Sequence, residues 1–405
     1  MTKKINFEKI SYYSLLLFAF FIPLSRASNS FFVFWLGVLA LIALKNDFTK
    51  TWNKIKSNQI FIYIFLFIGY MAFSIFWSKD IPLGINQLRL LSYWLLIPAI
   101  YILIKKEWLY PTLNSFLMGM LISEILAYGI YFDLWSIHGR TPDYPSPFMT
   151  HIHYSVFLAF TSLVLLYRLL YEHLSLKIKV LMLIFFLSST TNLMISTGRT
   201  GQLAFFITLF VVIFIKYRIN LKSFFATVVF SLIIAYTSYY TLPLFQKRVN
   251  AAVEDIQLIL THNYNSSFGI RTVWWIVTWD ALKEKPIFGY GLGAYKDTAK
   301  IMDKKYQYEG LNETMRYNLK TKHYHNQYLM TIVQGGLVGL FLMFLLFYKL
   351  YSLQIRDKEL KHLSIIAITV FLVAFIGEPL WLLQFPLILF IFLISIFIGA
   401  SKNDD

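Results

Sequence analysis

Long apolar stretches recur along almost the whole chain, separated by shorter polar segments. A helix crosses the hydrocarbon core of a bilayer with roughly 20 mostly apolar residues, because each residue advances the helix by about 1.5 Å. We therefore expect an all-α polytopic membrane protein. The sequence predicts twelve spans: Ile10–Ala27, Ser30–Leu44, Gln59–Trp77, Gln87–Ile104, Trp108–Phe132, His153–Tyr171, Ile178–Thr197, Gly201–Ile215, Ser223–Thr241, Asn326–Lys349, His362–Gly377 and Leu380–Ala400.

The composition supports this class and excludes others. Of the 405 residues, 58% are hydrophobic, 19% are aromatic and only 14% are charged, and the mean hydropathy is +0.59. Soluble domains carry about 25% charged residues, so a soluble globular enzyme and a disordered chain are excluded. The chain has no cysteine, which also excludes disulfide bonds, thiol nucleophiles and cysteine-ligated metals.

The lysines and arginines between the spans indicate the orientation of the chain. If the N-terminus is cytoplasmic, the inside segments and their flanks carry 20 of them, and the short outside segments carry five: Arg26, Lys79, Arg89, Arg140 and Arg199. We leave out the segment 242–325, because loops above about 60 residues translocate largely regardless of charge. Short cytoplasmic loops favour Lys and Arg. The bias predicts two cytoplasmic chain ends, and it explains the formal net charge of +16 without nucleic acid as a partner.

These predictions describe a single integral membrane domain in three parts. Residues 1–241 would hold transmembrane helices 1–9, residues 242–325 a periplasmic loop with short helices, and residues 326–405 transmembrane helices 10–12 and a short cytoplasmic tail.

Within the long loop, one aromatic segment has the pattern of a helix. The sequence predicts a helix over Phe268–Glu284, which Pro286 would end because proline cannot continue a helix. Gly289, Gly291 and Gly293 then predict a tight turn.

Two arginines lie at the outer ends of this arrangement. Arg199 lies in Ser-Thr-Gly-Arg-Thr-Gly between two spans, where we expect glycine to let the backbone approach a ligand. The alternative is a turn whose arginine extends into water. Arg271 opens the predicted loop helix, and the alternatives for it are a solvated loop charge or a cation–π contact with tryptophan. A guanidinium binds two phosphate oxygens and stays charged, so both arginines are candidates for anion binding.

His325 is the candidate for proton transfer. It lies at the outer mouth of the tenth span, and Gly336 follows eleven residues later, about three helical turns, so both are expected on one helix face. A helix N-terminus disfavours imidazolium, and a neutral histidine accepts a proton from a hydroxyl. The alternative is a structural interfacial histidine. His323, His151 and His153 are weaker candidates, of which the last two are expected to line the same outer cavity.

Two acidic residues lie at membrane depth, where an ionised group is costly. Glu124 lies in the fifth span, and Glu378 lies beside Pro379 in the break after the eleventh. We expect each to pair with a buried arginine, with a proton relay as the alternative.

Several common catalytic motifs are missing from the sequence. There is no Asp-x-Asp pair, no Gly-x-x-x-x-Gly-Lys-Ser/Thr loop, no Gly-x-Ser-x-Gly and no His-Glu-x-x-His. We therefore expect no metal and no nucleotide cofactor, and arginines would stabilise a charged leaving group.

The order of these motifs on this topology resembles the O-antigen ligase family. The resemblance rests on Ser-Thr-Gly-Arg at 196–199, on Gly-Ile-Arg at 269–271 with Pro-Ile-Phe-Gly-Tyr-Gly at 286–291, and on His-Asn at 325–326 with glycine eleven residues after the histidine. Two features depart from the family pattern: Tyr324 precedes His-Asn where a small residue or proline is common, and Thr-Gly-Arg-Thr-Gly replaces the commoner Ser-Arg-Gly order.

The resemblance implies a fold similar to GT-C-type glycosyltransferases and a role in lipopolysaccharide biosynthesis. The family takes a glycan from undecaprenyl diphosphate and joins it to a sugar hydroxyl of lipid A-core, at the periplasmic face of the bacterial inner membrane, without cofactor or metal. By resemblance, Arg199 and Arg271 engage the diphosphate and His325 is the catalytic residue. We expect substrate contacts from further polar side chains: Arg89, His151, His153, His323, Asn326 and Glu378.

Three alternative functions remain open. An O-antigen polymerase would use a second lipid-linked glycan as its acceptor, and a protein O-oligosaccharyltransferase would use a Ser or Thr. A flippase or transporter would carry out no chemistry, and its key polar groups would lie near the bilayer midplane, often on broken helices. The clustering of the candidate residues at the outer face favours an enzyme.

Overall fold

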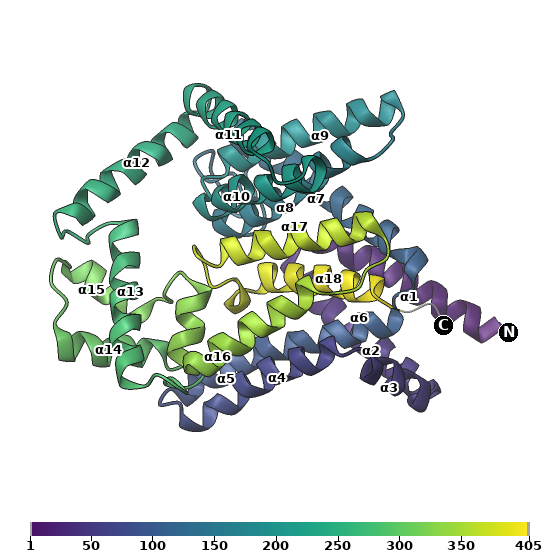
Figure 1. The fold of residues 1–405 in the computed structure, drawn as a ribbon, viewed down its shortest axis with the longest axis horizontal. Coiled ribbons are helices and arrows are strands. Elements are labelled where there is room, and N and C mark those ends of the chain that lie inside the picture. Colours follow the sequence, from purple (N-terminus) through teal and green to yellow (C-terminus); the bar gives the residue numbers. More distant parts are fainter. Residues whose placement is uncertain (1, 403–405) are drawn as a thin grey trace.

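The structure is a computed structural model that describes residues 2–402, and every regular element in this range is a helix (Figure 1). The predicted all-α class is confirmed. Residues 403–405 of the predicted cytoplasmic tail lie outside the described range.

Within the described residues, nine helical segments are long and apolar enough to cross a membrane. They are α2 (Arg26–Asn46), α4 with η1 (Ile60–Phe73 and Ser74–Trp77), α5, η2 and α6 (Ile81–Ser92, Tyr93–Leu95 and Leu96–Leu103), η3 with α7 (Lys106–Trp108 and Leu109–Tyr131), α8 (His151–Tyr171), α9 (Leu176–Ile195), α10 (Arg199–Tyr217), α11 (Leu221–Thr241) and α16 (Gln327–Tyr351). The chain is therefore a multi-pass membrane protein.

The three other predicted spans are helical as well, in α1 (Thr2–Phe21), α17 (Lys358–Ala374) and α18 (Gln384–Ala400), which follows the short helix η4 (Leu380–Leu382). Helix α18 has only 17 residues. It lies at the centre of the bundle, where it contacts α2, α6, α7, α8 and α17. Its side chains are buried almost throughout, which explains why it is apolar on all sides.

The first predicted span is wrong at its end. Helix α1 stops at Phe21, six residues before Ala27. The chain turns there because Ser25 caps the next helix, and its hydroxyl accepts a hydrogen bond from the backbone N–H of Ser28.

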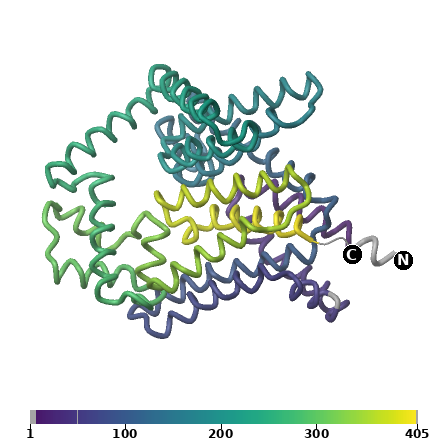
Figure 2. Tube along the Cα trace, viewed as in Figure 1, coloured from purple at the N-terminus to yellow at the C-terminus, as the bar shows by residue number. Residues whose placement is uncertain are grey.

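The segment between α11 and α16 forms four more helices: α12 (Pro243–Leu260), α13 (Ser267–Glu284), α14 (Tyr295–Tyr306) and α15 (Glu313–Thr321). The predicted helix Phe268–Glu284 is confirmed to within one residue. Figures 1 and 2 show α12–α15 at one end of the bundle and both chain ends at the other. We call these the loop end and the terminal end.

Helix α16 is broken where the loop end docks onto it. Gly336 has φ 62° and ψ −160°, which interrupts the helix. The segment 286–291 pairs with the opened backbone: Tyr290 N donates to Val333 O at 2.8 Å, and Leu337 N donates to Pro286 O at 2.9 Å. Irregular backbone at membrane depth is stable only when its polar groups are satisfied in this way. The predicted glycine turn follows directly, with positive φ at Gly289, Gly291 and Gly293.

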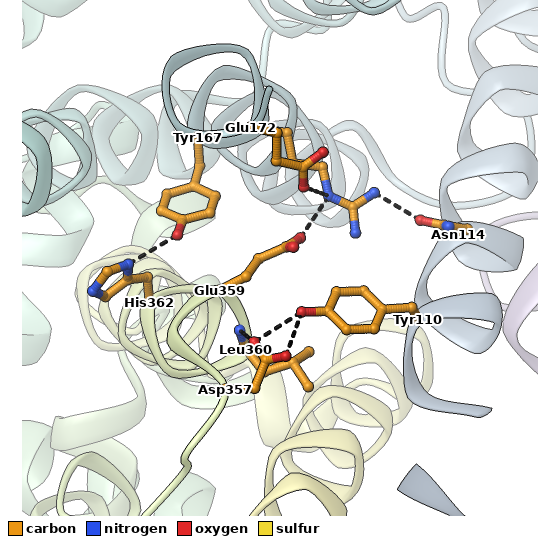
Figure 3. A network of polar contacts seen from close by, with 9 residues as sticks. Tyr110, Asn114, Tyr167, Glu172, Asp357, Glu359, Leu360 and His362 are labelled. Carbon is orange, nitrogen blue, oxygen red and sulfur yellow. Dashed lines mark hydrogen bonds and ion pairs between the residues drawn. The ribbon is translucent and has the colours of Figure 1, made fainter. Parts of the chain in front are cut away.

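A partly buried polar network joins α7, α8 and α17 at the terminal end (Figure 3). The guanidinium of Arg168 on α8 donates to Glu359 on α17 at 2.9 Å and to Asn114 on α7 at 2.7 Å. Tyr110 of α7 donates to Asp357, the N-cap of α17, at 2.8 Å. The short helix α3 (Phe48–Ser57) lies at the same end of the bundle (Figure 1).

Candidate active site

The three candidate catalytic residues line one small cavity at the loop end. Its volume is about 180 Å³, and its walls come from α8, the α9–α10 junction, α12, α13 and the start of α16. Its polar side chains are His151, Thr197, Arg199, Arg248, Ser267, Arg271 and His325, with Thr200 beside them.

Arg199 enters this cavity because the chain turns tightly between α9 and α10. Thr197 has φ 57°, and Gly198 precedes Arg199, the first residue of α10. A Cβ atom on Gly198 would lie 2.3 Å from Ser155 Oγ, and Gly201 N donates to the same hydroxyl at 3.0 Å. The two glycines therefore let α10 pack against α8. The expectation that they let the backbone approach a ligand stays a prediction.

The guanidinium of Arg199 is held by the protein itself. Its Nη1 lies 3.3 Å from Asp255 Oδ2, and its Nη2 donates to Arg248 O at 3.2 Å. The ring of Phe268 lies beneath it, 4.9 Å from the guanidinium carbon. With 23% of its side chain exposed, Arg199 points into the cavity and not into open water.

Arg271 lies next to Arg199 but lacks a carboxylate partner. Its guanidinium carbon lies 5.9 Å from the same Phe268 ring. In the described part of the chain, its side chain forms no salt bridge and no hydrogen bond. Burial lowers the pKa of Arg271, the opposing charge of Glu378 raises it, and the charge of Arg199 lowers it further. An anion in the cavity would compensate this charge.

His325 is held by a buried carboxylate. Its Nδ1 lies 2.7 Å from Glu378 Oε2, and Glu378 is 2% exposed. Burial raises the pKa of the Glu378 carboxyl. The hydrogen bond from His325, and the charges that His323, His325 and His153 carry when protonated, outweigh burial and hold this pKa below its usual value. An ionised carboxylate accepts the Nδ1 proton, so Nε2 of His325 is left as a proton acceptor.

His323 completes this group. Its Nε2 lies 3.5 Å from Glu378 Oε1, and its ring centroid lies 4.3 Å from that of His325. Burial lowers the pKa of His323 to about 4, against the opposing effect of the Glu378 charge. His323 is therefore neutral at pH 7. The expected pairing of Glu378 with an arginine is replaced by two histidines.

The predicted helix face shared by His325 and Gly336 is wrong. His325 lies before the helix, with φ 46°, and Asn326 is the N-cap of α16. The Asn326 amide accepts from Leu329 N at 3.1 Å and donates to Ile376 O at 3.1 Å. Asn326 therefore fastens the segment that carries Glu378 to the start of α16.

Of the remaining candidate residues, two histidines lie at or near the cavity, whereas Arg89 and Glu124 lie elsewhere in the fold. His151 lines the cavity, and His153 lies close enough to Glu378 for their charges to interact. Arg89 is exposed on α5 and lines neither this cavity nor the apolar cleft beside it. Glu124 is buried between α7 and α9, where it accepts hydrogen bonds from Ser188 and Ser189 instead of pairing with an arginine.

Three residues of the site were missed from the sequence: Arg248, Asp255 and Phe268. Arg248 and Asp255 lie seven residues apart on α12, which is two helical turns, so both face α10. From this seven-residue spacing, the sequence could have predicted that Arg248 and Asp255 lie on one face of α12. Phe268 offers no such signal, because its role depends on two guanidinium groups from different helices.

An apolar cleft of about 580 Å³ adjoins the polar cavity. Arg199, Arg248, Arg271 and His325 line both spaces. The cleft extends between α10, α12 and α13 along apolar side chains: Phe206, Phe245, Val249, Ile256, Ile259 and Trp275. A ligand with a charged head and a long apolar chain has the matching shape.

His323, His325 and Glu378 also bring three possible metal-ligand atoms within 4.8 Å of one another. The 2.7 Å between His325 Nδ1 and Glu378 Oε2 is a hydrogen-bond distance. Two ligand atoms of a tetrahedral zinc ion, each bonded at about 2.1 Å, lie roughly 3.4 Å apart. The arrangement fits a hydrogen-bonded triad better, and metal independence stays a prediction.

Comparison with known proteins confirms the resemblance drawn from the sequence. Residues 183–344 match the family described as O-antigen ligase, and this range contains Arg199, Arg271 and His325. An uncharacterised protein of Haemophilus influenzae is 31% identical over 152 residues, which cover 37% of this chain and 37% of that protein.

Proposed function

We propose that this chain, whose residues 183–344 match the family described as O-antigen ligase, transfers a glycan from undecaprenyl diphosphate to a sugar hydroxyl of lipid A-core. The reaction takes place at the periplasmic face of the inner membrane, in lipopolysaccharide biosynthesis. Arg199, Arg271 and His325 carry the chemistry, and no metal is required.

One observation carries this proposal: the half-buried guanidinium of Arg271 has no carboxylate partner in the described part of the chain, and it shares a cavity with Arg199 and His325. This pair of guanidinium groups suits the diphosphate of the donor. The adjoining apolar cleft suits the polyprenyl chain. A donor bound in this way has its sugar–phosphate bond beside His325.

The residues then have distinct chemical tasks. As the anomeric C–O bond breaks, negative charge grows on the leaving diphosphate, and two fixed guanidinium groups stabilise it more than they stabilise the ground state. His325 Nε2 takes the proton from the acceptor hydroxyl, and the ionised Glu378 stabilises the resulting imidazolium. Direct displacement by that hydroxyl inverts the anomeric configuration.

The test is transfer by the purified protein in detergent, with a lipid-linked donor, lipid A-core, EDTA and no energy source. We expect a ligated product that forms about ten- to a hundredfold more slowly in Arg271→Ala. A folded protein that moves the donor across vesicles and forms no product would be a flippase. If Mg²⁺ restored a transfer that EDTA had abolished, the arginines would not be sufficient for leaving-group stabilisation.

A deletion strain separates the related enzymes. Loss of long-chain lipopolysaccharide with accumulation of undecaprenyl-linked glycan indicates ligation. Loss of chain length with one unit still attached indicates polymerisation, and loss of glycan from Ser or Thr of a protein indicates a protein transferase. The first result is the expected one.

A further inference from the structure

A second large cavity lies at the terminal end, far from the active site. Its volume is about 710 Å³, and its walls come from α3, the start of α4, the ends of α6 and α16, and the residues after α18. Lys54, Lys349 and Lys402 line it, together with serine, asparagine, glutamine and tyrosine side chains. Among the described residues, no aspartate or glutamate lines this space.

Lys402 is held at the end of α6, inside this cavity. Lys402 Nζ donates to Tyr101 O and Ile104 O, both at 2.6 Å, and so caps the end of α6. Burial lowers the pKa of Lys402 to about 6, and the charges of Lys54 and Lys106 act in the same direction. An anion would relieve this repulsion.

Lys349 and Lys402 each lie over a tyrosine ring of the wall. Lys349 Nζ lies 4.8 Å from the ring centroid of Tyr63, and Lys402 Nζ lies 4.5 Å from that of Tyr101. In the part of the chain that the structure describes, neither lysine forms a salt bridge with a carboxylate. The Lys349 ammonium group is therefore oriented by the fold and still available to an anion.

The cavity lies at the depth of lipid headgroups. Helix α3 connects two spans and carries Phe48 and Trp52 on an exposed face, where their rings stack at 6.2 Å. Lys54 and Lys56 lie in its last turn. A helix with exposed aromatics and lysines lies in the plane of the membrane interface. The nearest abundant anions at such a place are lipid phosphates.

We propose that this cavity binds the phosphodiester headgroup of an anionic phospholipid, of the phosphatidylglycerol or cardiolipin class. Lys54 and Lys349 contact the phosphate, and the serine and amide side chains bind the glycerol hydroxyls. The lipid then links the ends of α3, α4, α6, α16 and α18, so it stabilises the folded protein in proportion to its occupancy.

The first test measures the thermal unfolding of delipidated full-length protein in detergent, titrated with tetraoleoyl cardiolipin, dioleoyl phosphatidylglycerol or dioleoyl phosphatidylethanolamine. We expect the two anionic lipids to raise the melting temperature and phosphatidylethanolamine to leave it unchanged. In Lys54→Gln/Lys349→Gln, the lipid concentration for half the effect should rise at least tenfold. The matched control Lys45→Gln/Lys56→Gln removes two charges outside the cavity and should respond like the wild type.

Inorganic phosphate at the same concentrations distinguishes the two sources of the anion. A rise in melting temperature with phosphate alone, lost in Lys54→Gln/Lys349→Gln, would overturn the lipid assignment in favour of a soluble anion. An equal cardiolipin effect in both double variants would overturn the site.

Native mass spectrometry of the wild type provides a test that needs no variant. The protein extracted in mild detergent should retain phosphatidylglycerol or cardiolipin in preference to phosphatidylethanolamine. Retention in proportion to the bulk lipid composition would also overturn the proposal.

Discussion

Arg199 and Arg271 lie side by side over one phenylalanine ring, but the protein compensates their charges differently. Arg199 is paired with Asp255 and with a backbone carbonyl, whereas Arg271 has only the ring in the described part of the chain. A fixed pair gives the site a rigid wall, and an uncompensated guanidinium gives it affinity for an anion.

This difference predicts that substitutions of the two arginines affect turnover and thermal stability differently. Arg271→Ala and Arg271→Lys should both lower turnover by about ten- to a hundredfold, or roughly 1.5–3 kcal/mol, because lysine lacks the bidentate fork. Neither should lower the melting temperature. Arg199→Ala should lower turnover and also the melting temperature, since it leaves the Asp255 carboxylate unpaired. Arg89→Ala is the control and should keep wild-type activity. Near-normal turnover in Arg271→Lys would contradict the proposed phosphate fork.

His325 and its neighbour His323 differ in a testable way. His325→Ala should lower turnover by about a hundred- to ten-thousandfold and leave donor binding intact, because the arginines hold the diphosphate. Glu378→Gln should lower turnover less than His325→Ala and should shift the pH profile. The glutamine oxygen still accepts a hydrogen bond from His325 Nδ1, but it carries no negative charge. Of the three substitutions, His323→Ala should lower turnover least. Donor binding and transfer are measured separately for each variant. If His325→Ala bound donor poorly and turned over bound donor normally, His325 would be a binding residue.

The neutral state of His323 makes stability depend on pH. Its folded pKa of about 4 lies below the usual 6.5, so the unfolded chain binds more protons between these values. Stability therefore falls as the pH falls from about 6.5 to 4. Glu378, whose pKa is held low, adds a loss below its usual value of 4.5. Melting temperatures across this range should fall less steeply for His323→Gln than for the wild type. Equal slopes would mean that His323 is not buried in its neutral form.

At the scale of elements, hydropathy predicted a helix in each of the twelve proposed spans but not how these helices are interrupted. A run of apolar residues shows that a segment is buried in lipid or protein. It does not show that α16 opens at Gly336 to pair with the segment 286–291, because this pairing depends on residues about 50 positions apart. The contact between His325 and Glu378 was hidden for the same reason, as 53 positions separate them.

Gly336 is the residue that permits this break. A Cβ atom there would lie 2.2 Å from Ile287 O, and its backbone angles suit only glycine. Gly336→Ala should therefore destabilise the protein by at least about 1–3 kcal/mol and detach the segment 286–291 from α16. Gly37→Ala in α2 is the matched control, since a Cβ atom there meets nothing within 4 Å. Thermal unfolding of both variants checks this, and an equal melting temperature would show that the break does not require glycine.

At the scale of the whole molecule, the distribution of Lys and Arg in the sequence predicted the orientation of the chain in the membrane. The excess of Lys and Arg predicted one side for both chain ends, and the structure brings these ends together, opposite α12–α15 (Figure 1). Which end faces the cytoplasm follows from the charge bias alone, since the fold has the same geometry in either orientation.

The absence of cysteine makes this orientation directly measurable. Glu309→Cys places a thiol on an exposed turn between α14 and α15, and Ile219→Cys places one on the exposed turn between α10 and α11. A membrane-impermeant maleimide should label Glu309→Cys in spheroplasts, and it should label Ile219→Cys only after the membrane is permeabilised. The wild type should stay unlabelled in both cases. The reverse pattern would place the arginines and His325 in the cytoplasm, where a periplasmic transfer to lipid A-core cannot occur.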